Sequence, residues 1–115
     1  MYLGIDVGTS SVKLVLIDDD QKVIASRSAD LDVSRPHPGW SEQDPESWWT
    51  ATAGLLDELA RSHAVATAAV KGIGLSGHMH GATLLDASDR PLRPCILWND
   101  VRAAAEAAGL DRNPV

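Results

Sequence analysis

Residues 2–17 read YLGIDVGTSSVKLVLI, two runs of aliphatic and β-branched residues on either side of a short polar turn. The runs predict strands at Tyr2 to Asp6 and at Val12 to Ile17, and a similar run predicts a third strand at Lys22 to Ser28. The connections between them are too short for a parallel return, which needs about a dozen residues or more. The sequence therefore predicts three antiparallel strands joined by hairpins.

A surface loop and then a helix are predicted next. Two prolines and a glycine interrupt any regular pattern between residues 30 and 44, which is typical of a loop. Asp44 is a natural N-cap, Pro45 suits the first helical position, and apolar side chains then recur at helical spacing up to Leu59. One face of this helix is expected to pack on the sheet.

The rest of the chain predicts four more elements and a frayed end. These are a strand of parallel sense from Val70 to Leu75, strands at Ala82 to Leu85 and at Cys95 to Trp98, a helix from about Val101 to near Gly109, and an irregular end at 111–115. The predicted fold class is α/β, with three N-terminal antiparallel strands followed by a helix and further strands in one mixed sheet.

The composition limits the kind of protein. A chain of 115 residues with 44% hydrophobic residues is one small domain with a real core. A net charge of −6 gives no electrostatic reason to bind nucleic acid or an anionic membrane. The sequence has no long apolar run and no signal-peptide pattern, so we expect a cytoplasmic protein. The single cysteine, Cys95, lies in an apolar run and is interpreted as a packed thiol.

The first turn carries the groups that could bind phosphate. Asp6 ends an apolar strand and is followed closely by Gly8, Thr9 and Ser10, whose amides and hydroxyls could face phosphate oxygens. Lys13 adds a positive charge, and Asp6 could hold a hydrated Mg²⁺ that bridges to phosphate. The residues alone leave two interpretations equally open, a phosphate site and an ordinary hairpin turn.

Four segments together resemble the FGGY carbohydrate kinase family of the actin-like, ribonuclease-H-like superfamily. They are YLGIDVGTSSVK at 2–13, RPHPGWSEQDP at 35–45, GHMHGA at 77–82 and RPCILWNDVR at 93–102, and the resemblance runs from Met1 to about Ala108. One departure is His78, where family members commonly have Gln. The resemblance implies an actin-like domain and, within the family, a pentulose kinase that uses ATP and Mg²⁺ to phosphorylate D-xylulose. A kinase for another ketose such as ribulose stays open, as does a non-catalytic sugar- or phosphate-binding or folding fragment.

The resemblance also implies roles for the residues of the first turn. Asp6 would be the catalytic residue and metal ligand beside the transferred phosphate, while Gly8, Thr9, Ser10 and Lys13 would line the nucleotide phosphates.

A second group of residues is implied on the sugar side. Met79 and His80 would contact the sugar and Trp98 would pack beside it. Asp100, counted with the substrate-binding residues, would brace that wall together with Arg102. The alternatives are a His80 ring satisfied by backbone groups and a Trp98 side chain in the core. Glu42 and Gln43, which belong to neither group, either lie near the cleft or cap local backbone.

The family's catalytic base is an aspartate in a downstream Gly-Gly-Asp-type motif, in a second domain that binds adenosine. Neither feature is found in residues 1–115, which we therefore expect to be a partial N-terminal FGGY sugar kinase domain with the C-terminal ATP-binding domain absent. We expect this chain by itself to be inactive, because the sugar hydroxyl must lose a proton as it attacks the γ-phosphate. Apolar surface left uncovered would favour self-association, for example as a homodimer.

Overall fold

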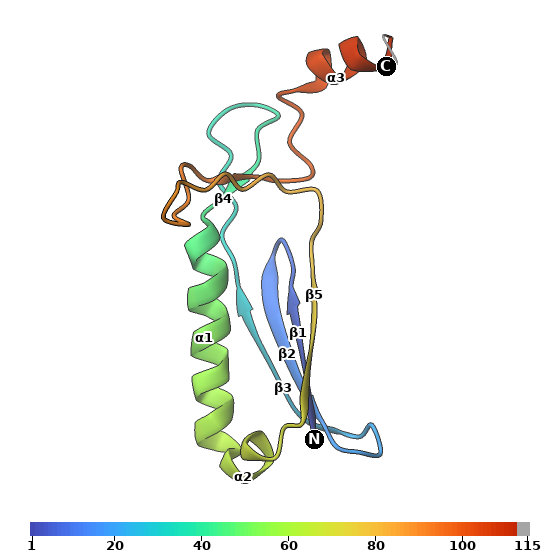
Figure 1. Cartoon of the computed structure of the whole chain (residues 1–115), viewed down its shortest axis with the longest axis vertical. Coiled ribbons are helices and arrows are strands. Elements are labelled where there is room, and N and C mark those ends of the chain that lie inside the picture. Colours follow the sequence, from blue (N-terminus) through green and yellow to red (C-terminus); the bar gives the residue numbers. More distant parts are fainter. Residues whose placement is uncertain (113–115) are drawn as a thin grey trace.

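A four-stranded sheet with one long helix beside it forms the body of the chain (Figure 1). The structure is a computed structural model and describes residues 1–112. Its elements are β1 (Tyr2–Val7), β2 (Ser11–Ile17), β3 (Val23–Asp30), β4 (Glu42–Gln43), α1 (Pro45–Ser62), α2 (Ala64–Ala68), β5 (Gly72–Gly77), β6 (Cys95–Ile96) and α3 (Ala104–Asp111). None of these helices is long and apolar enough to cross a membrane.

The sheet has the strand order β3-β2-β1-β5. β1 pairs with β2 and β2 pairs with β3 in antiparallel sense, while β5 returns parallel to β1 after the helical connection. Both predicted hairpins and the parallel sense of the fourth strand are confirmed. The α/β class with a mixed sheet is confirmed as well, and β5 lies two residues later in the sequence than predicted.

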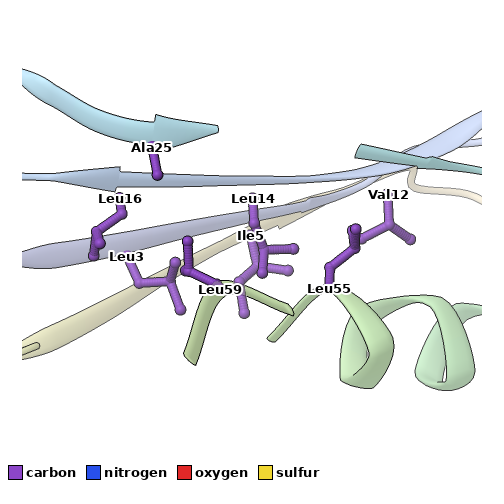
Figure 2. Close-up of a cluster of buried hydrophobic side chains, with 8 residues drawn as sticks. All are labelled: Leu3, Ile5, Val12, Leu14, Leu16, Ala25, Leu55 and Leu59. Atoms are coloured by element: carbon purple, nitrogen blue, oxygen red, sulfur yellow. The ribbon is translucent and has the colours of Figure 1, made fainter. Parts of the chain in front are cut away.

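The core lies between the sheet and α1 (Figure 2). Alternate residues of the first two strands are buried because successive side chains in a strand point to opposite faces, and α1 covers one of these faces with Leu55 and Leu59. The predicted start of the helix is confirmed, since Asp44 Oδ1 accepts a hydrogen bond from Glu46 N at 3.1 Å and Pro45 is the first helical residue. The sulfur-bearing Cys95 is fully buried, as predicted.

The loop predicted between residues 30 and 44 contains a short strand, β4, that the sequence does not predict. Glu42 and Gln43 form β4, which pairs antiparallel with Ile96 and Cys95 of β6, and both residues are buried. The strand expected at residues 95–98 therefore belongs to a separate two-stranded sheet and is shorter than predicted. A two-residue strand depends on a partner some 50 residues away, so no local pattern indicates it.

Residues 82–85 do not form the predicted strand. Two isolated bridges, Ala82 with Ile96 and Leu85 with Pro91, are found there instead. At the second bridge Asp86 N donates to Arg90 O and Leu92 N donates to Leu84 O, and the pairing extends no further.

The C-terminal helix also differs from the prediction. α3 begins at Ala104, three residues later than predicted, and in the segment before it Val101 N donates to Gly39 O and Arg102 N donates to Asp100 Oδ1. It then continues through Gly109 to Asp111, which corrects the predicted end and the frayed start at residue 111. The rest of the predicted frayed end, residues 113–115, lies outside the described residues. α3 has no buried residue and extends away from the body in Figure 1.

Candidate functional site

The turn between β1 and β2 is closed tightly and leaves backbone donors free. Gly8 N donates to Ser11 O at 3.0 Å. A Cβ on Gly8 would lie 3.0 Å from the same oxygen, a tighter contact than most side chains make, so glycine suits this closure. Within residues 1–112 the amides of Thr9 and Ser10 have no protein acceptor. The turn therefore carries two neighbouring N–H groups without an acceptor in the described residues, the kind of donor that binds an anion.

Gln43 holds this turn from behind. Its side chain is almost fully buried, and Nε2 donates to both Thr9 O and Asp32 O at 2.9 Å. Its Oε1 accepts a hydrogen bond of 2.7 Å from Trp48 Nε1 in the first turn of α1. The sequence left open a position near the cleft and the capping of local backbone, and Gln43 instead binds backbone 11 and 34 residues away, including the turn itself. The group that it binds is distant in sequence, and an amide directly before the N-cap is the only local signal.

Asp6 and Lys13 face each other across the hairpin. The strand register pairs Asp6 with Lys13 on β2 and with Ser76 on β5. These three residues line a shallow groove of about 420 Å³. Among the described residues, the exposed Asp6 carboxylate has neither a hydrogen-bond donor nor an ion-pair partner. Asp6 is thus free to accept an external ligand.

The donor set around Asp6 suits a hydrated cation that prefers oxygen ligands, such as Mg²⁺. Within residues 1–112 no three His, Cys, Asp or Glu side chains gather in a way that could enclose a metal ion. Mg²⁺ commonly keeps several waters and binds through one or two carboxylates together with substrate phosphates. A single free carboxylate beside free amides fits that mode of binding and does not fit a metal held by protein ligands alone.

The predicted sugar-side residues Met79, His80 and Trp98 come together with His78 around a hollow of about 300 Å³. His78 N donates to Val7 O at 2.9 Å, and the His78 ring meets the Trp48 ring edge-on with 5.0 Å between centroids. These contacts attach the start of the loop to the end of β1 and to α1. The hollow is therefore fixed next to the β1–β2 turn.

The structure decides the alternatives that the sequence left open for two of these residues. His80 is exposed, and in the described part of the chain its ring has no hydrogen-bond partner, so it is not satisfied by backbone groups. Trp98 is 60% exposed and is not a core residue. Its Nε1 donates to Thr9 Oγ1 at 3.2 Å, across 89 positions of sequence. That hydrogen bond brings the sugar-side hollow into direct contact with the phosphate-side turn.

Asp100 lies apart from the hollow, in a buried ion-pair network. Its side chain is 1% exposed. Asp100 Oδ2 accepts from Ser41 N at 2.7 Å and from Arg102 Nη2 at 2.6 Å. The hydrogen bonds from Arg102 hold the pKa of the Asp100 carboxyl well below its usual range, and the same contact raises the pKa of Arg102. Arg102 also lies 3.6 Å from the Trp40 ring centroid, with Nη1 2.8 Å from Glu42 Oε1. Asp100 therefore braces the segment that carries Trp98.

Comparisons with known proteins find similar sequences and structures over nearly the whole chain. Residues 1–114 match the model of the N-terminal domain of the FGGY family of carbohydrate kinases. The chain is 53% identical over 111 residues to a xylulose kinase of Escherichia coli, covering 96% of this chain and 22% of the relative. A crystal structure of a "xyloylose kinase" from Brucella ovis superposes with a TM-score of 0.94 at 58% identity, covering 98% of this chain and 24% of that one.

A more distant crystal structure, a xylulose kinase from Rhodospirillum rubrum, superposes with a TM-score of 0.90 at 34% identity. It covers 96% of this chain and 22% of its own. The chain thus spans less than a quarter of the length of these relatives.

Proposed function

The chain belongs to the FGGY family of carbohydrate kinases, and on this premise we propose that it is the N-terminal part of a xylulose kinase. The intact enzyme transfers the γ-phosphate of ATP to D-xylulose and gives D-xylulose 5-phosphate. In this proposal the chain supplies a wall of the cleft that binds both the sugar and the phosphates.

The observation that carries the proposal is the contact between Trp98 and Thr9. Phosphoryl transfer depends on holding an acceptor hydroxyl in line with the γ-phosphate, at near-contact distance. A sugar-sized hollow that adjoins a turn with free amides meets this requirement. A sugar-binding site remote from the turn would not hold the acceptor hydroxyl near the γ-phosphate.

On the phosphate side, we assign the free amides and hydroxyls of Thr9 and Ser10 to phosphate oxygens, with Lys13 adding a positive charge. Gly8 lets the turn close. Bound ATP supplies the transferred phosphoryl group, and bound Mg²⁺ reduces the repulsion between phosphate charges. Asp6 would hold that metal, because its carboxylate is exposed and has no partner among the described residues.

On the sugar side, His80 offers a ring nitrogen to a sugar hydroxyl, and Met79 and Trp98 offer apolar surface to the carbon skeleton. Met79 is 69% exposed, so its side chain is free to pack on a ligand. We assign Asp100 to the substrate site through its bracing of the 97–102 segment, since its own carboxylate is occupied by Arg102 and Ser41.

Deprotonation of the acceptor hydroxyl is the step that we do not assign to this chain. We propose that residues 1–115 are a partial domain that binds and orients the substrates, and that the base and the adenosine site belong to a second domain. ATP is the cytoplasmic phosphoryl donor, so we place the reaction in the cytoplasm. Self-association stays a prediction that sedimentation over a range of concentrations would check; the exposed Ile73 and Leu75 of the edge strand β5 are the surface concerned.

The proposed function is tested by titrating the ¹⁵N-labelled chain with D-xylulose and, separately, with Mg²⁺ and ATP. We expect D-xylulose to shift the signals of Met79, His80 and Trp98, and ATP to shift those of Thr9 and Ser10. Stronger shifts with D-ribulose than with D-xylulose would favour another ketose. Absence of shifts with every ligand up to millimolar concentration would refute the binding role and favour a folding fragment.

A coupled assay for D-xylulose 5-phosphate tests the missing step. We expect no turnover by the purified 115-residue chain. Product formed in proportion to this chain, and not by a mock preparation from the same host, would contradict the assignment of the base to a second domain.

A further inference from the structure

Thr9 is held from two sides by residues that are far away in the sequence. Gln43 Nε2 donates to its carbonyl oxygen at 2.9 Å, and Trp98 Nε1 donates to its hydroxyl oxygen at 3.2 Å. The buried amide of Gln43 fixes the backbone of the turn. The indole of Trp98 forms its hydrogen bond with the hydroxyl, which is the part of Thr9 that can still rotate.

The direction of the second hydrogen bond determines what the hydroxyl can do. A threonine hydroxyl has one proton to donate and two lone pairs that accept. Because the indole N–H can only donate, it occupies a lone pair of Thr9 Oγ1 and leaves the hydroxyl proton available. In residues 1–112 that proton has no protein acceptor. Trp98 therefore orients a free donor on the phosphate-side turn.

The same tryptophan lines the sugar-side hollow. Trp98 borders it together with Met79 and His80 and is 60% exposed, so a sugar in the hollow restricts the rotation of its ring. A restricted ring keeps its N–H on Thr9 for a larger fraction of the time. The conformational entropy lost in ordering the Thr9 hydroxyl is then lost when the sugar binds. Phosphate binding at the turn no longer includes that loss.

From these contacts we propose that Trp98 is a positioning residue that couples the two halves of the site: a sugar packed on its indole orients the Thr9 hydroxyl and strengthens phosphate binding at the turn. The proposal rests on the function proposed above and adds a linkage between its two ligands. Binding linkage is reciprocal, so ATP should strengthen sugar binding by the same factor. One neutral hydrogen bond corresponds to about fivefold in affinity.

The first test needs no ligand. The chain has four tryptophans, so its indole N–H signals can be assigned one by one in a ¹⁵N spectrum. We expect Thr9→Val to shift the Trp98 indole signal and to speed its exchange with solvent, because it removes the acceptor and keeps the shape. Thr9→Ser keeps a hydroxyl and should restore the signal of the unmodified chain. If Thr9→Val leaves the position and the exchange rate of the Trp98 indole signal unchanged, the proposal is overturned.

The second test measures the linkage itself. The affinity for ATP with Mg²⁺ is determined with and without saturating D-xylulose, and the ratio of the two dissociation constants is the coupling. We expect a ratio of about five in the unmodified chain and in Thr9→Ser, and a ratio near one in Thr9→Val and in Trp98→Phe, which keeps an aromatic ring and loses the N–H. Trp49→Phe is the matched control, because Trp49 is 67% exposed on α1 and within residues 1–112 has no hydrogen bond to Thr9.

The outcomes separate the linkage from the proposed function. If both ligands bind the unmodified chain independently, or if Trp98→Phe keeps the fivefold ratio, the coupling is refuted while the proposed function stands. If neither ligand binds, the proposed function of this chain fails and the coupling fails with it.

Discussion

Replacing Gln43 by alanine would test how the phosphate-side turn is held in place. The substitution removes three hydrogen bonds, of 2.9 Å to Thr9 O, 2.9 Å to Asp32 O and 2.7 Å from Trp48 Nε1. Each hydrogen bond contributes about 1 kcal/mol net to stability. After the substitution the partly buried partner atoms are only partly hydrated, so water does not fully replace the lost hydrogen bonds. The free energy of unfolding should therefore fall by about 3 kcal/mol. Such a loss is a large fraction of the roughly 5–15 kcal/mol that stabilises a domain.

The assay has a global and a local readout. Urea unfolding followed by tryptophan fluorescence gives the free energy of unfolding, and the midpoint of thermal unfolding should fall by about 10 °C. Hydrogen exchange of the amides at residues 8–11 should speed up more than exchange in the centre of the sheet, because the turn loses its support from β4. The matched control is Thr50→Ala, at an exposed position of α1, which should change stability by less than about 0.5 kcal/mol.

Two results would refute this reasoning. A loss of stability below about 1 kcal/mol would mean that the three hydrogen bonds are replaced by water at little cost. An unchanged exchange pattern at residues 8–11, together with a large global loss, would mean that Gln43 supports the core and not the turn.

Three further predictions concern the core, the backbone and pH. Leu14→Ala should lower the free energy of unfolding by about 3–4 kcal/mol in urea, because the side chain is fully buried between the sheet and α1. Gly39→Ala should cost about 1–3 kcal/mol in thermal unfolding, since φ is +79° and the new Cβ would lie 2.7 Å from Val101 Cγ2. Arg102 lowers the pKa of Asp100, so the carboxylate stabilises the fold above the unfolded pKa of about 3.9 and loses that effect as pH falls. The stability gap between the unmodified chain and Asp100→Asn should thus narrow below about pH 4.

Each of these predictions has an outcome that contradicts it. Val23 is 58% exposed, so Val23→Ala should cost far less than Leu14→Ala, and equal losses would argue against the assigned core. An unchanged midpoint for Gly39→Ala would mean that the loop relaxes freely around residue 39. A gap for Asp100→Asn that stays constant from neutral pH to pH 2 would exclude the ion pair with Arg102 as its origin.

Local signals predicted the elements whose partners are near in sequence. The β1–β2 and β2–β3 hairpins follow from short turns between apolar runs, and the start of α1 follows from its N-cap and proline. The strand predicted at residues 82–85 was wrong because its two ends pair with two different segments, Ala82 with Ile96 and Leu85 with Pro91, so that no continuous ladder forms. The alternation of apolar residues alone could not reveal that.

The residues of the first turn were predicted from their chemistry and from the family resemblance, and those of the sugar side from the resemblance alone. Trp98, Met79 and His80 are indeed brought together around one hollow, whereas Asp100 is buried in an ion-pair network behind it. The sequence contained no sign of that burial, because a carboxylate is buried only when distant partners satisfy it, here Ser41 and Arg102.

Local sequence patterns were enough to predict the three N-terminal strands, the start of α1 and the position of the polar turn, and the motifs resemble the family. How the turn is held, which of its amides lack an acceptor and what it touches depend on tertiary packing. Gln43 reaches Thr9 across 34 positions, and Trp98 reaches it across 89. Turns and caps are governed by neighbouring residues, so their chemistry can be read locally. A hydrogen bond between distant segments exists only when the packing of the whole sheet and helix brings donor and acceptor within about 3 Å.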